Sequence, residues 1–210
     1  MTLKAVVFDW DGTLVDTAES TYHTYRKTFA DYGIEFDRET YARIYAPCGD
    51  DMFRALGMPE EHWRAADDRW LEHFAGQTVE LLPGARESLM LVAEQGLARG
   101  IVTSGTRARV VRELVEHQLD PHFAHVTCGG DTPNRKPHPE PLLVCLDRLG
   151  VHPADAAYIG DSGEDVRMAK AAGVYVIGVT GPYPNHAALR ASAPDEIAEN
   201  VLDAVRRLLD

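Results

Sequence analysis

The alternation of short apolar runs with helix-like segments is the feature that most constrains the fold of this chain. Five apolar runs, each bounded by glycine, aspartate or proline, lie at residues 5–8, 98–102, 125–128, 156–159 and 174–179. Patterns typical of helices lie between the later runs, at 84–95, 107–119, 139–149 and 164–172. Strands separated by helices predict an α/β fold, a Rossmann-like parallel sheet in a three-layer arrangement with helices on both faces.

One long segment interrupts this alternation. Residues 17–81 contain no convincing strand, only helix-like stretches at 18–31, 38–46, 50–56 and 60–75. Pro83 and Gly84 follow this segment and are typical of a crossing between domains. We therefore expect a Rossmann-like core formed by residues 1–16 and 82–210, with an inserted α-helical cap domain at 17–81.

Composition narrows the classes of function. The chain has 33 acidic and 21 basic residues and a formal net charge of −12, so it lacks the basic face that a nucleic-acid binder needs. Its three cysteines are widely spaced, which favours a reducing compartment over a disulfide framework. No window approaches the ~20 apolar residues of a membrane span. We expect a cytoplasmic monomer or homodimer with no nucleic-acid or membrane partner.

Polar residues gather where the predicted strands end. Because ligands of open parallel sheets bind at the carboxyl ends of the strands, these residues are expected to share one site. They are Asp9 and Asp11 after the first run, Thr103, Ser104 and Gly105 after the second, Lys136 ahead of the fourth, and Asp161 and Asp165 after the fourth.

Each of these signals has a structural explanation when it is taken alone. Asp11 and Gly12 form a common turn pair, and residues 103–105 are suited to cap a helix. Acidic residues at 161–165 would also suit a helix N-terminus. Four carboxylates at one sheet edge, however, would repel one another unless a cation lay among them. Oxygen ligands favour Mg²⁺, which commonly takes part of its shell from a phosphate.

The spacing of Asp9 and Asp11 indicates a two-step phosphoryl transfer. One carboxylate would attack phosphorus, and the second would protonate the leaving alkoxide and later activate water. Because residues i and i+2 of a strand point the same way, both would face the substrate while Trp10 faces the other side.

Four segments together resemble the motifs of the haloacid dehalogenase superfamily, in the order of that family and over nearly the whole chain. They are "DWDGTLVD", "IVTS", "RKPHPEP" and "IGDSGEDVRMAKAAG". The helical segment after the first motif is similar to the cap of the subgroup that includes phosphoglycolate phosphatases and β-phosphoglucomutases. The resemblance implies a phosphoric monoester hydrolase that acts on a small phosphorylated metabolite.

The resemblance also implies roles for individual residues. Asp9 would be the nucleophile and Asp11 the general acid/base. Mg²⁺ would be bound by Asp9, the backbone carbonyl of Asp11 and Asp161, with Asp165 orienting these ligands or reaching the metal through water. Lys136 would pair with Asp9 and with the phosphoryl group, which would also contact Thr103, Ser104 and Gly105.

Other functions stay open at this stage. A phosphomutase of the β-phosphoglucomutase type is one, although Gly49 stands where such enzymes carry a basic residue, and Arg54 is the nearby substitute. A non-catalytic metabolite-binding protein with the same fold is another. Tyr22 and Tyr25 lie at helical spacing in the helical segment and are expected to pack within it rather than to bind a ligand.

Overall fold

The structure of the chain is a computed structural model that describes residues 2–210. It divides into two compact units. One comprises the residues up to Asp16 together with Glu80–Asp210, and the other comprises Thr17–Val79. We describe each unit by itself and call them the sheet unit and the helical unit.

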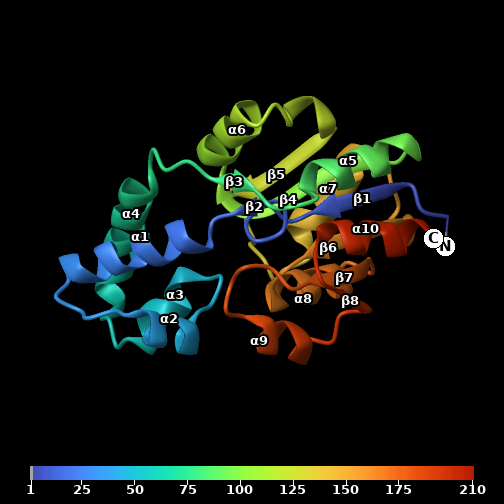
Figure 1. Ribbon diagram of the computed structural model, residues 1–210. Coiled ribbons are helices and arrows are strands. Elements are labelled where there is room, and N and C mark those ends of the chain that lie inside the picture. The colour runs from blue at the N-terminus through green and yellow to red at the C-terminus, as the bar shows by residue number, and fades with distance from the viewer. Residues whose placement is uncertain (1) are drawn as a thin grey trace. The chain divides into compact units, whose positions relative to one another are not determined.

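The sheet unit is built on six parallel strands (Figure 1). In chain order they are β1 (Ala5–Phe8), β4 (Ala98–Thr106), β5 (His125–Gly129), β6 (Ala156–Gly160), β7 (Tyr175–Val179) and β8 (Glu196–Ala198). Their spatial order is β5-β4-β1-β6-β7-β8, so β1 lies between β4 and β6. The prediction of a parallel α/β sheet is confirmed.

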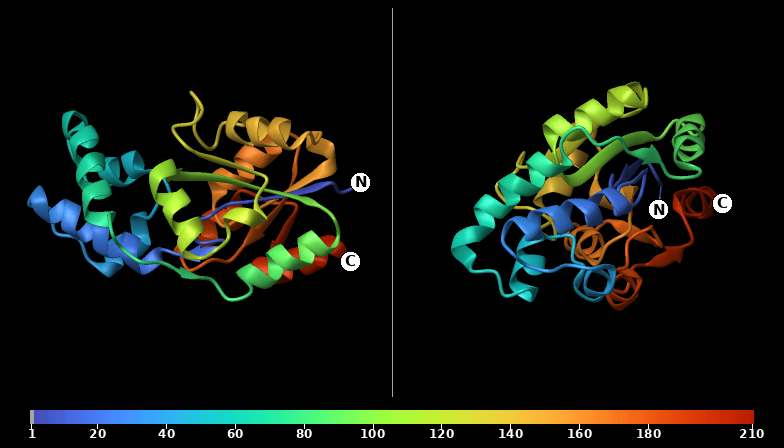
Figure 2. Two further views of the ribbon diagram at one scale, coloured as in Figure 1. Left: turned by 90° about the horizontal axis from the view of Figure 1, so that it is seen from above. Right: turned by 60° about the vertical axis from the view of Figure 1, so that its left-hand side comes forward.

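Helices cover both faces of this sheet. They are α5 (Ala85–Glu94), α6 (Arg107–Glu116), α7 (Glu140–Leu149), α8 (Gly163–Ala171), α9 (His186–Ala191) and α10 (Val201–Leu209). Figure 2 shows α7 and α8 on one side of the strands and α5 beside α10 on the other. Leu142 and Cys145 of α7 and Met168 of α8 belong to one buried cluster with Val7 of β1 and Val176 of β7. Every residue of β1 and of β6 is buried, as a parallel sheet covered on both faces requires.

Parts of the sheet unit differ from the sequence-based expectation. Strand β4 continues to Thr106, with a shift of register between Val102 and Thr106, so it is longer than the predicted run. Two-residue strands β2 (Val15–Asp16) and β3 (Glu80–Leu81) pair antiparallel, which places residues 80–81 in the sheet unit rather than in the helical segment. Strand β8 was not predicted, because three residues are too short to show a period.

The helical unit contains no strand among its described residues. Its helices are α1 (Ala18–Asp31), α2 (Arg38–Ile44), α3 (Gly49–Ala55) and α4 (Trp63–Phe74), the last preceded by a 3₁₀ turn at Glu60–His62. An aromatic cluster forms its core, including Tyr22, Tyr25, Phe29, Phe36, Tyr41 and Phe53. Tyr22 and Tyr25 are thus buried packing residues within this unit. Ring contacts such as the stacked Tyr25–Phe29 pair account for the density of aromatic residues in this segment.

Two further expectations concern the cysteines and membrane-spanning segments. Cys48, Cys128 and Cys145 are free thiols. Among the described residues, no helix combines the length and the apolar character needed to cross a bilayer.

Candidate active site

Asp9 lies at the point where β1 ends, between the ends of two neighbouring strands. The register pairs Phe8 with Ile101 of β4 and with Ile159 of β6, so the residues that follow these positions meet at one edge of the sheet. The Asp9 N–H still donates to the Ile159 carbonyl at 2.8 Å. The strand order therefore brings segments 9–11, 103–105 and 160–165 together, although they are far apart in the sequence.

The chain turns sharply just after Asp9. The amides of Leu14 and Val15 both donate to the Trp10 carbonyl, and Gly12 has φ +79°, which a side chain would strain. Because the strand has ended at Phe8, the alternation expected for Asp9, Trp10 and Asp11 does not extend to them. Asp9 contacts Lys136, whereas Asp11 and Trp10 both contact residues of α6, so the expectation that Asp9 and Asp11 point one way and Trp10 the other is wrong.

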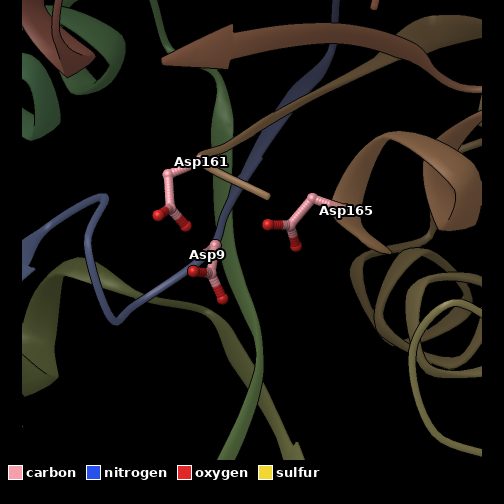
Figure 3. Close-up of side chains that lie close together, drawn as sticks. All are labelled: Asp9, Asp161 and Asp165. Atoms are coloured by element: carbon pink, nitrogen blue, oxygen red, sulfur yellow. The ribbon is translucent and has the colours of Figure 1, made fainter. Parts of the chain in front are cut away.

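Three carboxylates and one lysine form a buried cluster at the end of β1. Figure 3 shows Asp9, Asp161 and Asp165 directed toward a common space, and one oxygen of each lies within 4.8 Å of the others. Lys136 Nζ donates to Asp9 Oδ1 at 2.7 Å and to Asp165 Oδ1 at 2.6 Å. The Lys136 side chain is only 5% exposed, so these contacts are made away from bulk solvent.

The charge of this cluster is out of balance. Burial raises the pKa of Asp9 to about 7, against the opposing effect of Lys136. Burial and the neighbouring carboxylates of Asp9 and Asp165 raise the pKa of Asp161 well above its ordinary range. Although burial disfavours its charge, Lys136 has a raised pKa because Asp165 and Asp9 stabilise the ammonium. One lysine thus faces three acids, and the cluster favours an added cation.

Asp165 has a second role at the start of α8. The Ser162 hydroxyl accepts from the Asp165 N–H, while the Ser162 N–H and hydroxyl donate to Asp165 Oδ2, forming a capping box. Oδ1 of Asp165 contacts Lys136 and, at 2.8 Å, the hydroxyl of Tyr158. The helix-capping explanation of this segment is therefore also correct. Both oxygens of Asp165 already have donors, which suits an orienting residue better than a direct metal ligand.

Two residues that sequence reasoning missed support the cluster. The Tyr158 hydroxyl lies 2.8 Å from Lys136 Nζ and 3.0 Å from the Val102 carbonyl, and so it joins β6 to β4 beneath the lysine. Asn185 Nδ2 donates to the Asp161 carbonyl at 3.1 Å. Tyr158 could have been found from the sequence, because its hydroxyl is a polar group within an otherwise apolar predicted strand and needs a hydrogen-bond partner. Asn185 follows no recognisable pattern in the sequence.

The segment 103–105 forms the last part of β4 rather than a loop after it. Thr103 is buried, Ser104 is exposed, and the Gly105 N–H donates to Thr103 Oγ1 at 3.0 Å. The next helix, α6, begins at Arg107 with no side-chain cap among the described residues. Hydroxyl and amide groups therefore lie at the same sheet edge as Asp9, where an anion could accept hydrogen bonds from them.

The carboxylate of Asp11 lies in a different group of charges. Arg109 of α6 donates from Nη1 to Asp11 Oδ1 at 2.8 Å and from Nη2 to Asp11 Oδ2 at 2.5 Å. Trp10 Nε1 donates to Glu113 of α6 at 2.7 Å, so Trp10 and Asp11 both contact this helix while Asp9 contacts Lys136. Burial disfavours the charge of Arg109, but Asp11 and Glu113 outweigh this effect and raise its pKa. Sequence reasoning missed Arg109 and Glu113, whose i,i+4 spacing is ordinary for a helix.

Arg54, the substitute considered for a basic substrate-binding residue, makes contacts within the helical unit. Its guanidinium pairs with Asp51 at 2.5 Å and lies 4.9 Å from the ring centroid of Trp63. Its side chain is 62% exposed. These contacts are typical of a surface arginine.

Comparison with known proteins places the chain in a family. The profile of the haloacid dehalogenase-like hydrolases matches residues 6–179. The phosphoglycolate phosphatase of Yersinia pestis is 31% identical over 211 residues, which cover 96% of this chain and 91% of that protein.

Solved structures agree with this match. A provisionally assigned phosphoglycolate phosphatase from Lactobacillus plantarum is 26% identical and superposes with a TM-score of 0.89 over 98% of this chain and 99% of its own. A provisionally assigned β-phosphoglucomutase from Thermotoga maritima is also 26% identical, with a TM-score of 0.73 over 98% of this chain and 100% of its own. The resemblance found in the sequence motifs is confirmed: the chain belongs to the haloacid dehalogenase-like hydrolases and is a phosphoric monoester hydrolase.

Proposed function

We propose that this phosphatase hydrolyses a small-molecule phosphomonoester through an aspartyl-phosphate on Asp9, with Mg²⁺ as cofactor. The observation that carries the proposal is the position of Asp9. Its buried carboxylate stands at the end of the central strand, 2.7 Å from Lys136 and in one cluster with Asp161 and Asp165. A carboxylate in this setting is held in place, and a cation at the same site would favour the approach of a phosphate dianion.

The proposed reaction has two steps. In the first, an oxygen of Asp9 attacks phosphorus, the ester P–O bond breaks, and Asp11 gives a proton to the departing alkoxide. In the second, Asp11 takes a proton from water, the water oxygen attacks phosphorus, and the acyl-phosphate bond breaks to release phosphate and restore Asp9. Lys136 and the segment Thr103–Gly105 would hold the phosphoryl oxygens during both steps.

The residues present fit a hard divalent cation. Three buried carboxylates face a single lysine, and all of the candidate ligand atoms are oxygens. Asp9, Asp161 and the backbone carbonyl of Asp11 would hold Mg²⁺, with Asp165 orienting them through its contacts with Lys136 and Ser162. When bound, the cation supplies charge stabilisation for the phosphoryl group.

The names of the relatives favour phosphoglycolate or a similar small ester as the substrate. Sugar, polyol and nucleotide phosphates are the other candidate substrates. We propose that the helical unit, Thr17–Val79, acts as a cap that selects among them. The sugar phosphomutase alternative receives support from the β-phosphoglucomutase neighbour but not from Gly49, because the motif resemblance implies a basic residue at about this position of such an enzyme. Release of free phosphate distinguishes hydrolysis from transfer within a sugar.

A substrate screen with a nucleophile variant tests the proposal. The native enzyme with Mg²⁺ is expected to release phosphate from 4-nitrophenyl phosphate and from at least one of 2-phosphoglycolate, sugar, polyol and nucleotide phosphates. Asp9→Asn should lower turnover by at least about 1000-fold, the order of loss seen when a nucleophile is removed. Asp155→Asn, at an exposed ion pair with Lys4, is the matched control and should retain activity.

Covalent trapping supplies the second readout. Acid quenching during turnover, followed by peptide mass spectrometry, should find phosphate attached to Asp9. Turnover retained in Asp9→Asn, or phosphate on another residue, would overturn the aspartyl-phosphate proposal. Complete silence of the native enzyme across the screen would favour the metabolite-binding alternative.

A further inference from the structure

Arg109 holds the carboxylate of Asp11 by a two-point contact. Its two terminal nitrogens each donate to a different oxygen of the same carboxylate, at 2.8 and 2.5 Å. This two-point geometry fixes the rotation of the carboxyl group as well as its position. The side chain of Arg109 is 11% exposed and that of Asp11 is 24% exposed, so the pair differs from an ordinary surface salt bridge.

Arg109 is in turn held by a buried partner. Nη1 also contacts Glu113 Oε2 at 3.1 Å, and the Glu113 side chain is fully buried. The same Glu113 oxygen accepts from Trp10 Nε1 at 2.7 Å. Trp10 is the residue between Asp9 and Asp11, so the two contacts tie the whole Asp9–Asp11 segment to α6. The Arg109 guanidinium therefore pairs with two carboxylates, those of Asp11 and Glu113.

The sequence of β4 leaves room for this arrangement. A Cβ atom built on Gly105 would overlap the Arg109 guanidinium and would lie 3.0 Å from Val110 Cγ2. Any side chain at residue 105 would therefore push Arg109 away from Asp11. Glycine at this position lets the arginine cross the end of β4 to reach the carboxylate.

We infer that Arg109 is a positioning residue for proton transfer, which fixes the orientation of the Asp11 carboxylate. The inference rests on the proposed role of Asp11 as the acid and base of the reaction. A general acid must carry a proton and lie within hydrogen-bond reach of the leaving oxygen. Each oxygen of Asp11 has a second lone pair that Arg109 does not occupy and that can carry this proton. A freely rotating carboxyl group would be correctly oriented for only part of the time.

The test compares two aryl phosphates of similar shape. 4-Nitrophenolate leaves without help, whereas phenolate has a pKa near that of tyrosine, about 10, and needs a proton from the acid. Since a general acid contributes about 100-fold or more, Arg109→Gln should lower kcat/KM for phenyl phosphate by about 10- to 100-fold. For 4-nitrophenyl phosphate the loss should stay below about 3-fold, because departure of that group does not depend on the acid.

Two variants serve as controls. Arg206→Gln removes an exposed arginine of α10, which pairs with Glu87 at 2.9 Å, and should leave the ratio of the two kcat/KM values unchanged. Arg109→Lys keeps a cation beside Glu113 but loses the fork, so it should lower the ratio by an intermediate factor. If Arg109→Gln does not fold, as judged by circular dichroism, the lysine variant decides the question.

The outcomes separate this inference from the proposed function. Equal losses on both substrates, or no loss on either, would overturn the positioning role. Asp11→Asn should show the same selective loss, and adding Arg109→Gln to it should change the ratio by less than about 2-fold, because both changes remove one function. If Asp9→Asn is inactive but Arg109→Gln leaves the ratio unchanged, only the inference fails. If Asp9→Asn retains turnover, the proposed function fails.

Discussion

Asp9 and Asp11 are two residues apart, yet they belong to charged groups with different compositions. Asp9 shares its surroundings with two further carboxylates and one ammonium group. Asp11 shares Arg109 with Glu113, and Arg112 lies at the edge of that group. The Asp9 group carries an excess of negative charge, whereas the Asp11 group has arginines that balance its carboxylates.

This difference indicates different tasks for two carboxylates on one turn. A group with unbalanced buried charge is costly unless a cation joins it, so the Asp9 group is suited to bind one. A group whose carboxylate is held at two points by a buried arginine is suited to keep a fixed orientation.

Removal of divalent metal should have the largest effect, and only through the Asp9 group. Excess EDTA should lower hydrolysis of 4-nitrophenyl phosphate by about 1000-fold, since metal stabilisation of a phosphoryl group amounts to several kcal/mol, and Mg²⁺ should restore it. Mg²⁺ should also raise the melting temperature of the native protein and have a much smaller effect on Asp161→Asn. Full turnover in excess EDTA would contradict the assignment of a metal to this group.

Loss of the single lysine should be the next largest effect. Lys136→Met leaves the cluster without its cation and should destabilise the metal-free protein by about 3–5 kcal/mol, as for one partner of a buried pair. Urea unfolding measures this change, and activity should fall by about 100-fold or more. Lys4→Met is the matched control: its pair with Asp155 is exposed and should be worth about 1 kcal/mol or less. Equal stability of the two variants would contradict the contrast.

The Asp11 group should respond more mildly to the loss of a charge. Glu113→Gln keeps an oxygen for Trp10 Nε1 but removes the negative charge beside Arg109, and we expect about 1–3 kcal/mol of destabilisation by urea unfolding. Glu116→Gln, on the same helix with a 47% exposed side chain, should change stability by less than about 0.5 kcal/mol. A neutral Glu113→Gln would show that this group does not depend on its buried carboxylate.

The smallest effect concerns pH and the metal-free Asp9 group. The pKa of Asp9 is raised from 3.8 to about 7, so between these values the folded protein holds a proton that the unfolded chain has lost. Stability should therefore fall as pH rises through this interval and level off above it. In EDTA, Asp9→Asn should gain about 4–9 °C in melting temperature relative to native between pH 5 and pH 7, since the native protein loses about 2 kcal/mol over this interval and each kcal/mol corresponds to about 2–4 °C. A constant difference between the two proteins would contradict this prediction.

Elements with a long repeating pattern could be predicted from the sequence. Helix α1 begins and ends where the pattern at 18–31 predicts, and each of the five predicted strands occurs within a residue or two of its start. The short strands β2, β3 and β8 were missed, because two or three residues show no period and depend on the partner strand for their conformation. Strand β4 was predicted too short, because Thr103, Ser104 and Gly105 have the composition of a turn.

The residues at the strand ends could also be predicted from the chain alone. Parallel strands joined by helices bring their carboxyl ends to one edge, so acidic and hydroxyl residues after these strands imply a shared site before any distance is known. The family motifs added a function to that site. The sequence thus determined the fold class, the family and four members of the cluster, Asp9, Lys136, Asp161 and Asp165.

Only the tertiary structure decided how these residues pair. Asp11 meets Arg109 across 98 residues and Trp10 meets Glu113 across 103, and neither contact leaves a pattern in the sequence. Strand periodicity predicted the opposite orientation for Trp10, because it assumed that β1 continues to residue 11, whereas the chain turns directly after Asp9. Periodicity describes a side chain only while the backbone remains regular, and the functional residues of this protein begin where that regularity ends.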